Sequence, residues 1–201
     1  MAEELYTGPK FETVFISNEQ PSHPHLSELM HWCSVFHQKD LAPAHESGTA
    51  GNLSFRLRQG ENAFCITAAG LTAKCKLTEG DFVVVESCDI KAKKVFVRGT
   101  RQPSSESMMH FVIYKTLPHI NAVFHGHHQG LLDKAEKLNI PVTNKSCEYG
   151  SVDLIDNIIP LLGICDFFII REHGFLATGT DMNMTGTLSI DYKNKNDELG
   201  F

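Results

Sequence analysis

The segment around residue 125 has the residue types and spacing of a metal site. His125 and His127 follow the apolar residues 122–124 and are separated by one glycine. Side chains two positions apart on a β-strand point to the same side, so both imidazoles can face one ion. Neutral imidazole is the commonest protein ligand for zinc, and a catalytic zinc keeps three protein ligands and one open position. We therefore expect a third ligand elsewhere in the chain.

His173 is the candidate for the third ligand. It follows a second apolar run, at residues 167–170, and precedes Gly174. We expect Gly174 to turn the chain sharply beside the ion, because glycine adopts positive φ at little cost. A carboxylate, Glu106, is offered at the head of a predicted helix. On the histidines alone, a polar strand end with solvated imidazole rings stays open as the alternative.

Two other polar segments have the composition of an anion site. Residues 48–52 are rich in glycine, which lets backbone N–H groups approach a ligand closely, and Thr49 and Asn52 add side-chain donors. Ser104 is a natural N-cap beside Ser105, and exposed N–H groups at a helix start favour anions. From these residues alone, a plain turn is the better interpretation of the first segment. Capping alone explains the second equally well.

Composition limits the classes of function. The chain has 201 residues, of which 42% are hydrophobic and 21% charged, as in a folded globular protein of one domain. Its formal net charge of -6 argues against a nucleic-acid binder, but a small anionic metabolite fits. Six cysteines without a C-x-x-C pair favour a reduced, cytoplasmic protein. We expect no signal peptide and no membrane span, because neither the first ten residues nor the window 158–170 has a sufficient apolar run.

Hydrophobic periodicity predicts the elements that must position these groups. We expect a polar, poorly fixed segment at residues 1–24, followed by one domain at residues 25–201, and only a short helix or loop after residue 181. Strands interleaved with helices, rarely in strict alternation, favour an α/β or α+β fold. Helices are predicted at 24–40, 104–117, 130–138 and 152–162, and strands at 52–56, 63–67, 81–86, 95–98, 121–126, 140–143 and 166–170.

Five segments, in one order along the chain, carry a resemblance to a known family. They are residues 48–54, 66–70, 103–106, 121–127 and 172–174. Together they resemble the class II aldolase/adducin head family over roughly residues 26 to 185. The resemblance implies a central, mostly antiparallel β-sheet flanked by helices, usually assembled as a symmetric homotetramer.

The resemblance also assigns roles to the residues of the site. It gives one zinc, or another divalent metal, per subunit to His125, His127 and His173. Glu106 would be a metal-binding carboxylate and the catalytic base. The residues assigned to the phosphate group of the substrate are Thr49, Asn52, Gly70, Ser104 and Ser105.

The implied activity is that of a lyase. A zinc-dependent class II aldolase would cleave a fuculose-phosphate-like ketose 1-phosphate into dihydroxyacetone phosphate and an aldehyde, through an enediolate that the metal stabilises. The expected partners are this sugar phosphate and further copies of the chain, with no nucleic acid and no membrane. The sequence departs from the family pattern where Asn144 and Lys145 replace a common tyrosine acid, and where Ala69 replaces a hydroxyl residue.

Other functions remain open on the same scaffold. A methylthioribulose-1-phosphate dehydratase and a ribulose-phosphate 4-epimerase are the enzymatic alternatives, and glutamate rather than aspartate at position 106 disfavours the epimerase. A non-enzymatic, adducin-head-like assembly module would not need the three histidines and Glu106. A structural zinc would require four closed ligands, and no cysteine lies close in sequence to the histidines.

Overall fold

Eight strands form one sheet in the computed structural model, which describes residues 8–45 and 48–200. In spatial order the strands are β1 (Glu12–Ser17), β7 (Lys94–Arg98), β6 (Phe82–Asp89), β5 (Phe64–Thr67), β4 (Asn52–Arg56), β8 (Ala122–Gly126), β10 (Gly174–Gly179) and β9 (Phe167–Ile170). Neighbouring strands are antiparallel, except that β1 is parallel to β7. A separate two-stranded ribbon joins β2 (Ala44–His45) to β3 (Gly48–Thr49).

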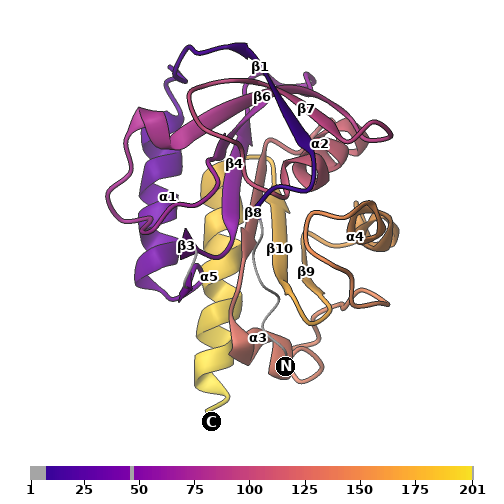
Figure 1. Ribbon diagram of the computed structural model, residues 1–201. Coiled ribbons are helices and arrows are strands. Elements are labelled where there is room, and N and C mark those ends of the chain that lie inside the picture. The colour runs from indigo at the N-terminus through magenta and orange to yellow at the C-terminus, as the bar shows by residue number, and fades with distance from the viewer. Residues whose placement is uncertain (1–7, 46–47, 201) are drawn as a thin grey trace.

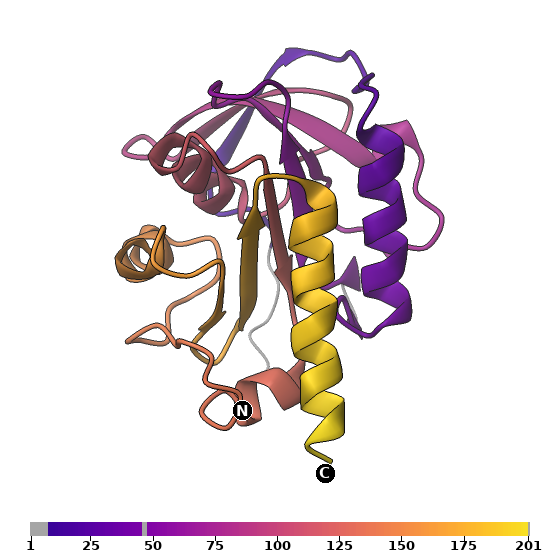
Figure 2. The same ribbon diagram turned by 180° about the vertical axis from the view of Figure 1, so that it is seen from behind.

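Helices cover both faces of this sheet (Figures 1 and 2). Helices α1 (Leu26–Gln38) and α5 (Met182–Glu198) lie side by side on one face, and α2 (Ser107–Thr116) and α4 (Val152–Ile158) lie on the other. The smaller elements are α3 (Gln129–Asp133) and the 3-10 turns η1 (Glu79–Asp81) and η2 (Ile159–Leu161). The predicted fold class, a mostly antiparallel sheet flanked by helices, is confirmed.

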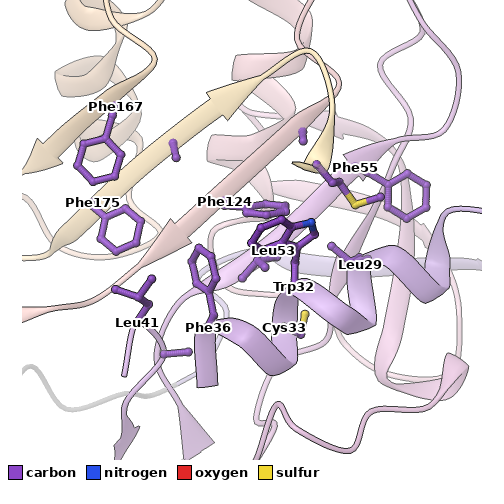
Figure 3. Close-up of a cluster of buried hydrophobic side chains, with 14 of the residues drawn as sticks. Leu29, Trp32, Cys33, Phe36, Leu41, Leu53, Phe55, Phe124, Phe167 and Phe175 are labelled. Carbon is purple, nitrogen blue, oxygen red and sulfur yellow. The ribbon is translucent and has the colours of Figure 1, made fainter. Parts of the chain in front are cut away.

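Alternation along the central strands divides the core into two layers. Phe124 on β8 packs with Trp32 and Phe36 of α1 on one face (Figure 3), whereas its neighbour Val123 packs on the α2 face. This period of two is what a strand buried on both faces requires. His125 falls on the same face as Val123, so it lies under the start of α2.

The N-terminal and C-terminal elements differ from the predictions. Residues 12–17 form β1, so the expectation of a poorly fixed segment is wrong for this part, and residues 1–7 lie outside the described ranges. The strand was not predicted because β1 lies at the edge of the sheet and carries polar side chains. Helix α5, at residues 182–198, is much longer than the short helix or loop that we expected.

Three inner elements also differ. Strand β10 was not predicted, because its residues show no alternation and are buried on both faces. The predicted helix at 130–138 is helical only to Asp133. The predicted strand at 140–143 makes a single parallel bridge, from Val142 to Ile169.

Candidate metal centre and substrate site

Strand β8 delivers the first two histidines to the centre of the sheet. It is paired on both sides, with His125 opposite Asn52 of β4 and opposite Leu176 of β10. The side chain of His125 is fully buried, and its Nδ1 lies 2.7 Å from the carbonyl oxygen of Phe175. A carbonyl oxygen can only accept, so Nδ1 carries the proton and Nε2 is left with a lone pair.

The turn between β9 and β10 delivers His173. The turn's positive φ lies at Glu172 (φ 58), so our prediction that Gly174 turns the chain with positive φ is wrong. Gly174 is needed for space instead. A Cβ there would lie 2.5 Å from the carbonyl oxygen of Gly126 and 2.7 Å from the His125 ring. Glycine at position 174 therefore lets the hairpin close against the histidines of β8.

The three imidazoles converge on one point. Their candidate ligand atoms on His125, His127 and His173 all lie within 4.8 Å of one another. The Nε2 atoms of His125 and His127 are 2.9 Å apart. The rings of His125 and His173 are nearly parallel, with centroids 5.0 Å apart. The structure thus brings together the three histidines that the sequence suggested as ligands.

Glu106 approaches the three imidazoles from the start of helix α2. It is the N-cap residue of α2, is buried, and places Oε1 2.9 Å from Nε2 of His173 and Oε2 3.1 Å from Nε2 of His125. Asn52 donates from Nδ2 to Oε2 of Glu106 at 2.8 Å. The carboxylate is therefore held between two imidazoles and one amide.

Burial sets the protonation states of this cluster. It lowers the pKa of His125 to about 4, against the opposing effect of Glu106, and it lowers the pKa of His127 well below 6.5. Burial alone would raise the pKa of Glu106. The adjacent His125 and His173 and the hydrogen bond from Asn52 outweigh it and hold that pKa well below its usual range.

This arrangement fits a bound divalent cation. The Nε2 lone pair of His125 faces a carboxylate oxygen of Glu106 at 3.1 Å, and without a proton or a cation between them the two lone pairs repel. Three imidazoles with one adjacent carboxylate are a donor set typical of zinc and similar ions. The candidate metal centre thus consists of His125, His127, His173 and Glu106.

Most of the residues predicted to bind phosphate lie on adjoining loops. Thr49 donates from Oγ1 to the carbonyl oxygen of Leu71 at 2.9 Å, which joins its turn to the loop of Gly70. Ser104 joins that loop too, because its N–H donates to the carbonyl oxygen of Thr67 at 3.2 Å. Gly70 has a φ of +67, and a Cβ there would meet nothing within 4 Å, so open space adjoins these groups.

The remaining predicted residues are placed differently. Ser105 is buried next to Ser104, and its carbonyl oxygen would lie 2.8 Å from a Cβ on Gly150. The Asn52 amide is directed to Glu106, which associates this residue with the metal centre in the present arrangement. Tyr149, near the expected position of a tyrosine acid, instead donates from its hydroxyl to the carbonyl oxygen of Gly8 at 3.3 Å.

One charged residue of the site was not predicted from the sequence. Lys74 is buried and donates to three oxygen atoms of Thr49 and Ala50. It stands in a loop without hydrophobic periodicity, four positions after Gly70, so no pattern distinguished it from an exposed lysine. A second omission is His110, which lies one helical turn after Glu106 and is completely buried.

A family model and several curated relatives match this chain. The family model described as Class II Aldolase and Adducin N-terminal domain matches residues 27–191. A methylthioribulose-1-phosphate dehydratase of Yersinia enterocolitica is 33% identical over 57% of this chain, and the chain spans only 50% of that relative's length. Dehydratases of the same name from several other bacteria match too.

Two further relatives are aldolases. An L-fuculose phosphate aldolase of Methanococcus vannielii is 28% identical over 78% of this chain and 85% of its own length. A solved structure of an L-fuculose 1-phosphate aldolase has a TM-score of 0.70 at 24% identity, with 90% of both chains covered, and supports the fold. No helix within residues 8–45 and 48–200 is long and apolar enough to cross a membrane.

Proposed function

The chain belongs to the class II aldolase and adducin N-terminal domain family, and on this premise we propose that it is a metal-dependent lyase acting on a phosphorylated ketose. Dehydration is the first candidate reaction, because relatives from several bacteria are named methylthioribulose-1-phosphate dehydratase. One observation carries the proposal. Three imidazoles, one of them fully buried and two partly buried, and the buried carboxylate of Glu106 converge on one point.

A purely structural role explains this convergence poorly. Burying a polar group costs free energy unless its hydrogen bonds are satisfied, and a buried carboxylate costs more. At this site the Nε2 lone pair of His125 opposes a carboxylate oxygen of Glu106. In an adducin-head-like assembly module, these buried polar groups would destabilise the fold and would serve no function. The cluster therefore favours an enzyme over an assembly module.

The roles of the chain's own residues follow from their chemistry. A bound divalent ion, zinc or a similar metal, would supply Lewis-acid polarisation of the substrate carbonyl. Glu106 would act as the base, since its carboxylate stays ionised and Asn52 fixes one of its oxygens. In a dehydration it removes the proton from the carbon next to the carbonyl. The hydroxyl group on the following carbon takes up a proton and leaves as water.

The phosphate group of the substrate would bind beside this centre. Thr49, Gly70 and Ser104 lie on adjoining loops around open space, with Ser105 next to them. Contacts far from the reacting carbon contribute binding energy and orientation. Asn52 stays a predicted phosphate contact, in competition with its bond to Glu106.

Aldol cleavage is the second candidate. The aldolase of Methanococcus vannielii matches over 85% of its own length, as one of the dehydratases does. Cleavage would use the same base and the same phosphate site, but a carbon–carbon bond would break in place of a carbon–oxygen bond. We also propose assembly as a homotetramer, which light scattering of the purified protein would test.

Metal content is the first test. We expect about one divalent ion per chain by elemental analysis of the wild type, and its loss in His125→Ala purified in the same way. Lys115→Ala, a change of an exposed residue, serves as the control and keeps the metal. No metal in the wild type after supplementation with zinc, manganese or iron would contradict the proposal and favour the assembly module.

Product analysis then separates the two reactions. With methylthioribulose 1-phosphate, dehydration gives a product lighter by one water with an intact carbon chain. With fuculose 1-phosphate, cleavage releases dihydroxyacetone phosphate, which a coupled reductase assay detects. A metal-loaded protein that converts neither of these ketoses nor a panel of other phosphorylated ketoses would refute the proposed substrate class.

A further inference from the structure

Lys74 has a buried environment that is unusual for a lysine. Its side chain is only 2% exposed. The ammonium group donates to Oγ1 of Thr49 at 2.7 Å, to the carbonyl oxygen of Ala50 at 2.8 Å and to the carbonyl oxygen of Thr49 at 3.2 Å. All three N–H groups of the ammonium are thus used within one turn of the chain.

The acceptors around this charge are all neutral. They are two carbonyl oxygens and one hydroxyl, and no carboxylate forms an ion pair with Lys74 in the described part of the chain. Burial lowers the pKa of Lys74 to about 8, with Cys33 opposing, so the amine is mostly charged at neutral pH. A buried charge without a counter-ion is unfavourable. An anion that binds nearby would relieve this cost.

The turn that Lys74 holds is packed between the predicted phosphate loops and the metal centre. A Cβ on Gly48 would lie 2.9 Å from the carbonyl oxygen of Leu71, and a Cβ on Gly51 would lie 2.6 Å from the carbonyl oxygen of His125. The turn therefore contacts the loop of Gly70 on one side and the end of β8 on the other. A shift of this turn would change the distance between the phosphate loops and the histidines.

The hydroxyl of Thr49 is already occupied in this arrangement. It has one proton, which it donates to the carbonyl oxygen of Leu71, and it accepts a bond from Lys74. It has no second proton for a phosphate oxygen. Thr49 thus acts as an anchor of the turn, and the positive charge at this place comes from Lys74.

We propose that Lys74 is a positioning residue of the phosphate site: it fixes the turn at residues 48–51 and provides the positive charge that the substrate's phosphate group neutralises. The inference rests on the proposed function, because it takes a phosphorylated ketose as the substrate. It adds that phosphate affinity depends on a residue whose ammonium group does not touch the substrate.

The test measures inorganic phosphate binding to the metal-loaded protein by calorimetry. Lys74→Met removes the charge and keeps the length of the side chain, and we expect a rise of about tenfold in the phosphate Kd with unchanged metal content. Lys74→Arg keeps the charge and is expected to recover part of the affinity. Lys76→Met removes an exposed charge from the same loop and leaves the Kd unchanged.

Acetate separates an effect on the turn from an effect on the metal. Acetate is a small anion that a metal ion binds, and its Kd is expected to be the same in Lys74→Met and wild type. An equal loss of acetate and phosphate affinity would overturn the proposal, because the charge would then act on the metal centre. With a turned-over substrate, Lys74→Met is expected to raise KM and to leave kcat within about twofold.

The outcomes distinguish this inference from the proposed function. Wild type that binds phosphate while Lys74→Met binds it equally well overturns the role of Lys74 and leaves the proposed function in place. Metal-loaded wild type that binds no phosphate and turns over no phosphorylated ketose overturns both. Should Lys74→Met not fold, Lys74→Gln, which keeps an N–H donor for the turn, replaces it with the same expected loss.

Discussion

The two faces of strand β4 are built from different chemistry. Leu53 and Phe55 point to the α1 face, where they join an apolar layer with Phe124. Asn52 and Ser54 alternate with them and point to α2, as Arg56 does. The face toward α1 therefore contributes to stability by apolar packing, and the face toward α2 contributes by directional hydrogen bonds.

The polar face fixes the position of α2. Ser54 lies 2.7 Å from Nδ1 of His110 and 2.8 Å from the hydroxyl of Tyr114, and Arg56 donates to the carbonyl oxygens of Tyr114 and Leu117. Because Glu106, His110 and Tyr114 are four residues apart, they share one side of the helix. Bonds along the whole of β4 thus hold the helix that positions the proposed base.

The largest expected effect lies at the end of the polar face. Glu106→Gln is expected to lower turnover by up to about 10⁴-fold, because an amide cannot accept the proton. The three histidines remain, so metal content by elemental analysis should stay near one ion per chain. Glu86→Gln, at the surface ion pair with Arg98, is the control. Unchanged turnover in Glu106→Gln would remove this residue from the mechanism.

Substitutions on the apolar face are expected to lower the free energy of unfolding and to leave turnover nearly unchanged. Phe124→Ala leaves a cavity between β8 and α1, which should lower the free energy of unfolding by about 3–5 kcal/mol in urea titrations. Turnover per folded molecule should stay within about threefold. Ile164→Ala, at a side chain that is 78% exposed, should cost less than about 0.5 kcal/mol. A large loss of turnover at full folding would show that the two faces are not independent.

A pH dependence is expected from the polar face. Burial lowers the pKa of His110 to about 3, with Glu106 opposing, so the native ring is neutral and the unfolded chain takes up a proton below about pH 6.5. Stability should therefore fall as the pH drops from 6.5 toward 3. Between pH 7 and pH 5, His110 should account for about 2 kcal/mol. His110→Asn should lose that much less than wild type in this interval, and equal losses would exclude His110 as the source.

The smallest effect is expected from a single hydroxyl. Ser54→Ala leaves Nδ1 of His110 and the hydroxyl of Tyr114 without this partner, at a cost of about 1–2 kcal/mol in thermal or urea unfolding. Ser87→Ala, on the exposed side of β6, should change stability by less than about 0.5 kcal/mol. If the two substitutions cost the same, the bonds of the polar face add little to stability.

The sequence predicted those parts of the site that depend on local spacing. The one-residue gap between His125 and His127 on a strand puts both rings on one side, and this holds in the structure. Alternation likewise indicated β4, and short runs of apolar and β-branched residues indicated β5 to β7. His173 and Glu106 were proposed from their positions after an apolar run and at a helix start, and the family resemblance assigned both to the same centre.

Contacts between distant segments could not be predicted. In the sequence, nothing distinguishes Lys74 from an exposed loop lysine, because its burial depends on contacts with the turn that follows β3. The need for glycine at position 174 is likewise explained only by its close approach to Gly126. Strand β10 is buried on both faces and so lacks alternation. Each of these features depends on which segments meet across the sheet, and a single sequence carries no periodic signal for that.

Strand β1 constrains how the chain folds during synthesis. Its residues emerge from the ribosome well before those of β7, with which they pair from Glu12 and Lys94 onward. At roughly 5–20 residues per second, β1 waits for several seconds without a neighbour. Even in the folded protein, Phe15 and Ile16 are 44% and 54% exposed at this edge. Strand β1 is thus made well before the strand that protects it, which makes it a target for chaperones and for unwanted strand pairing.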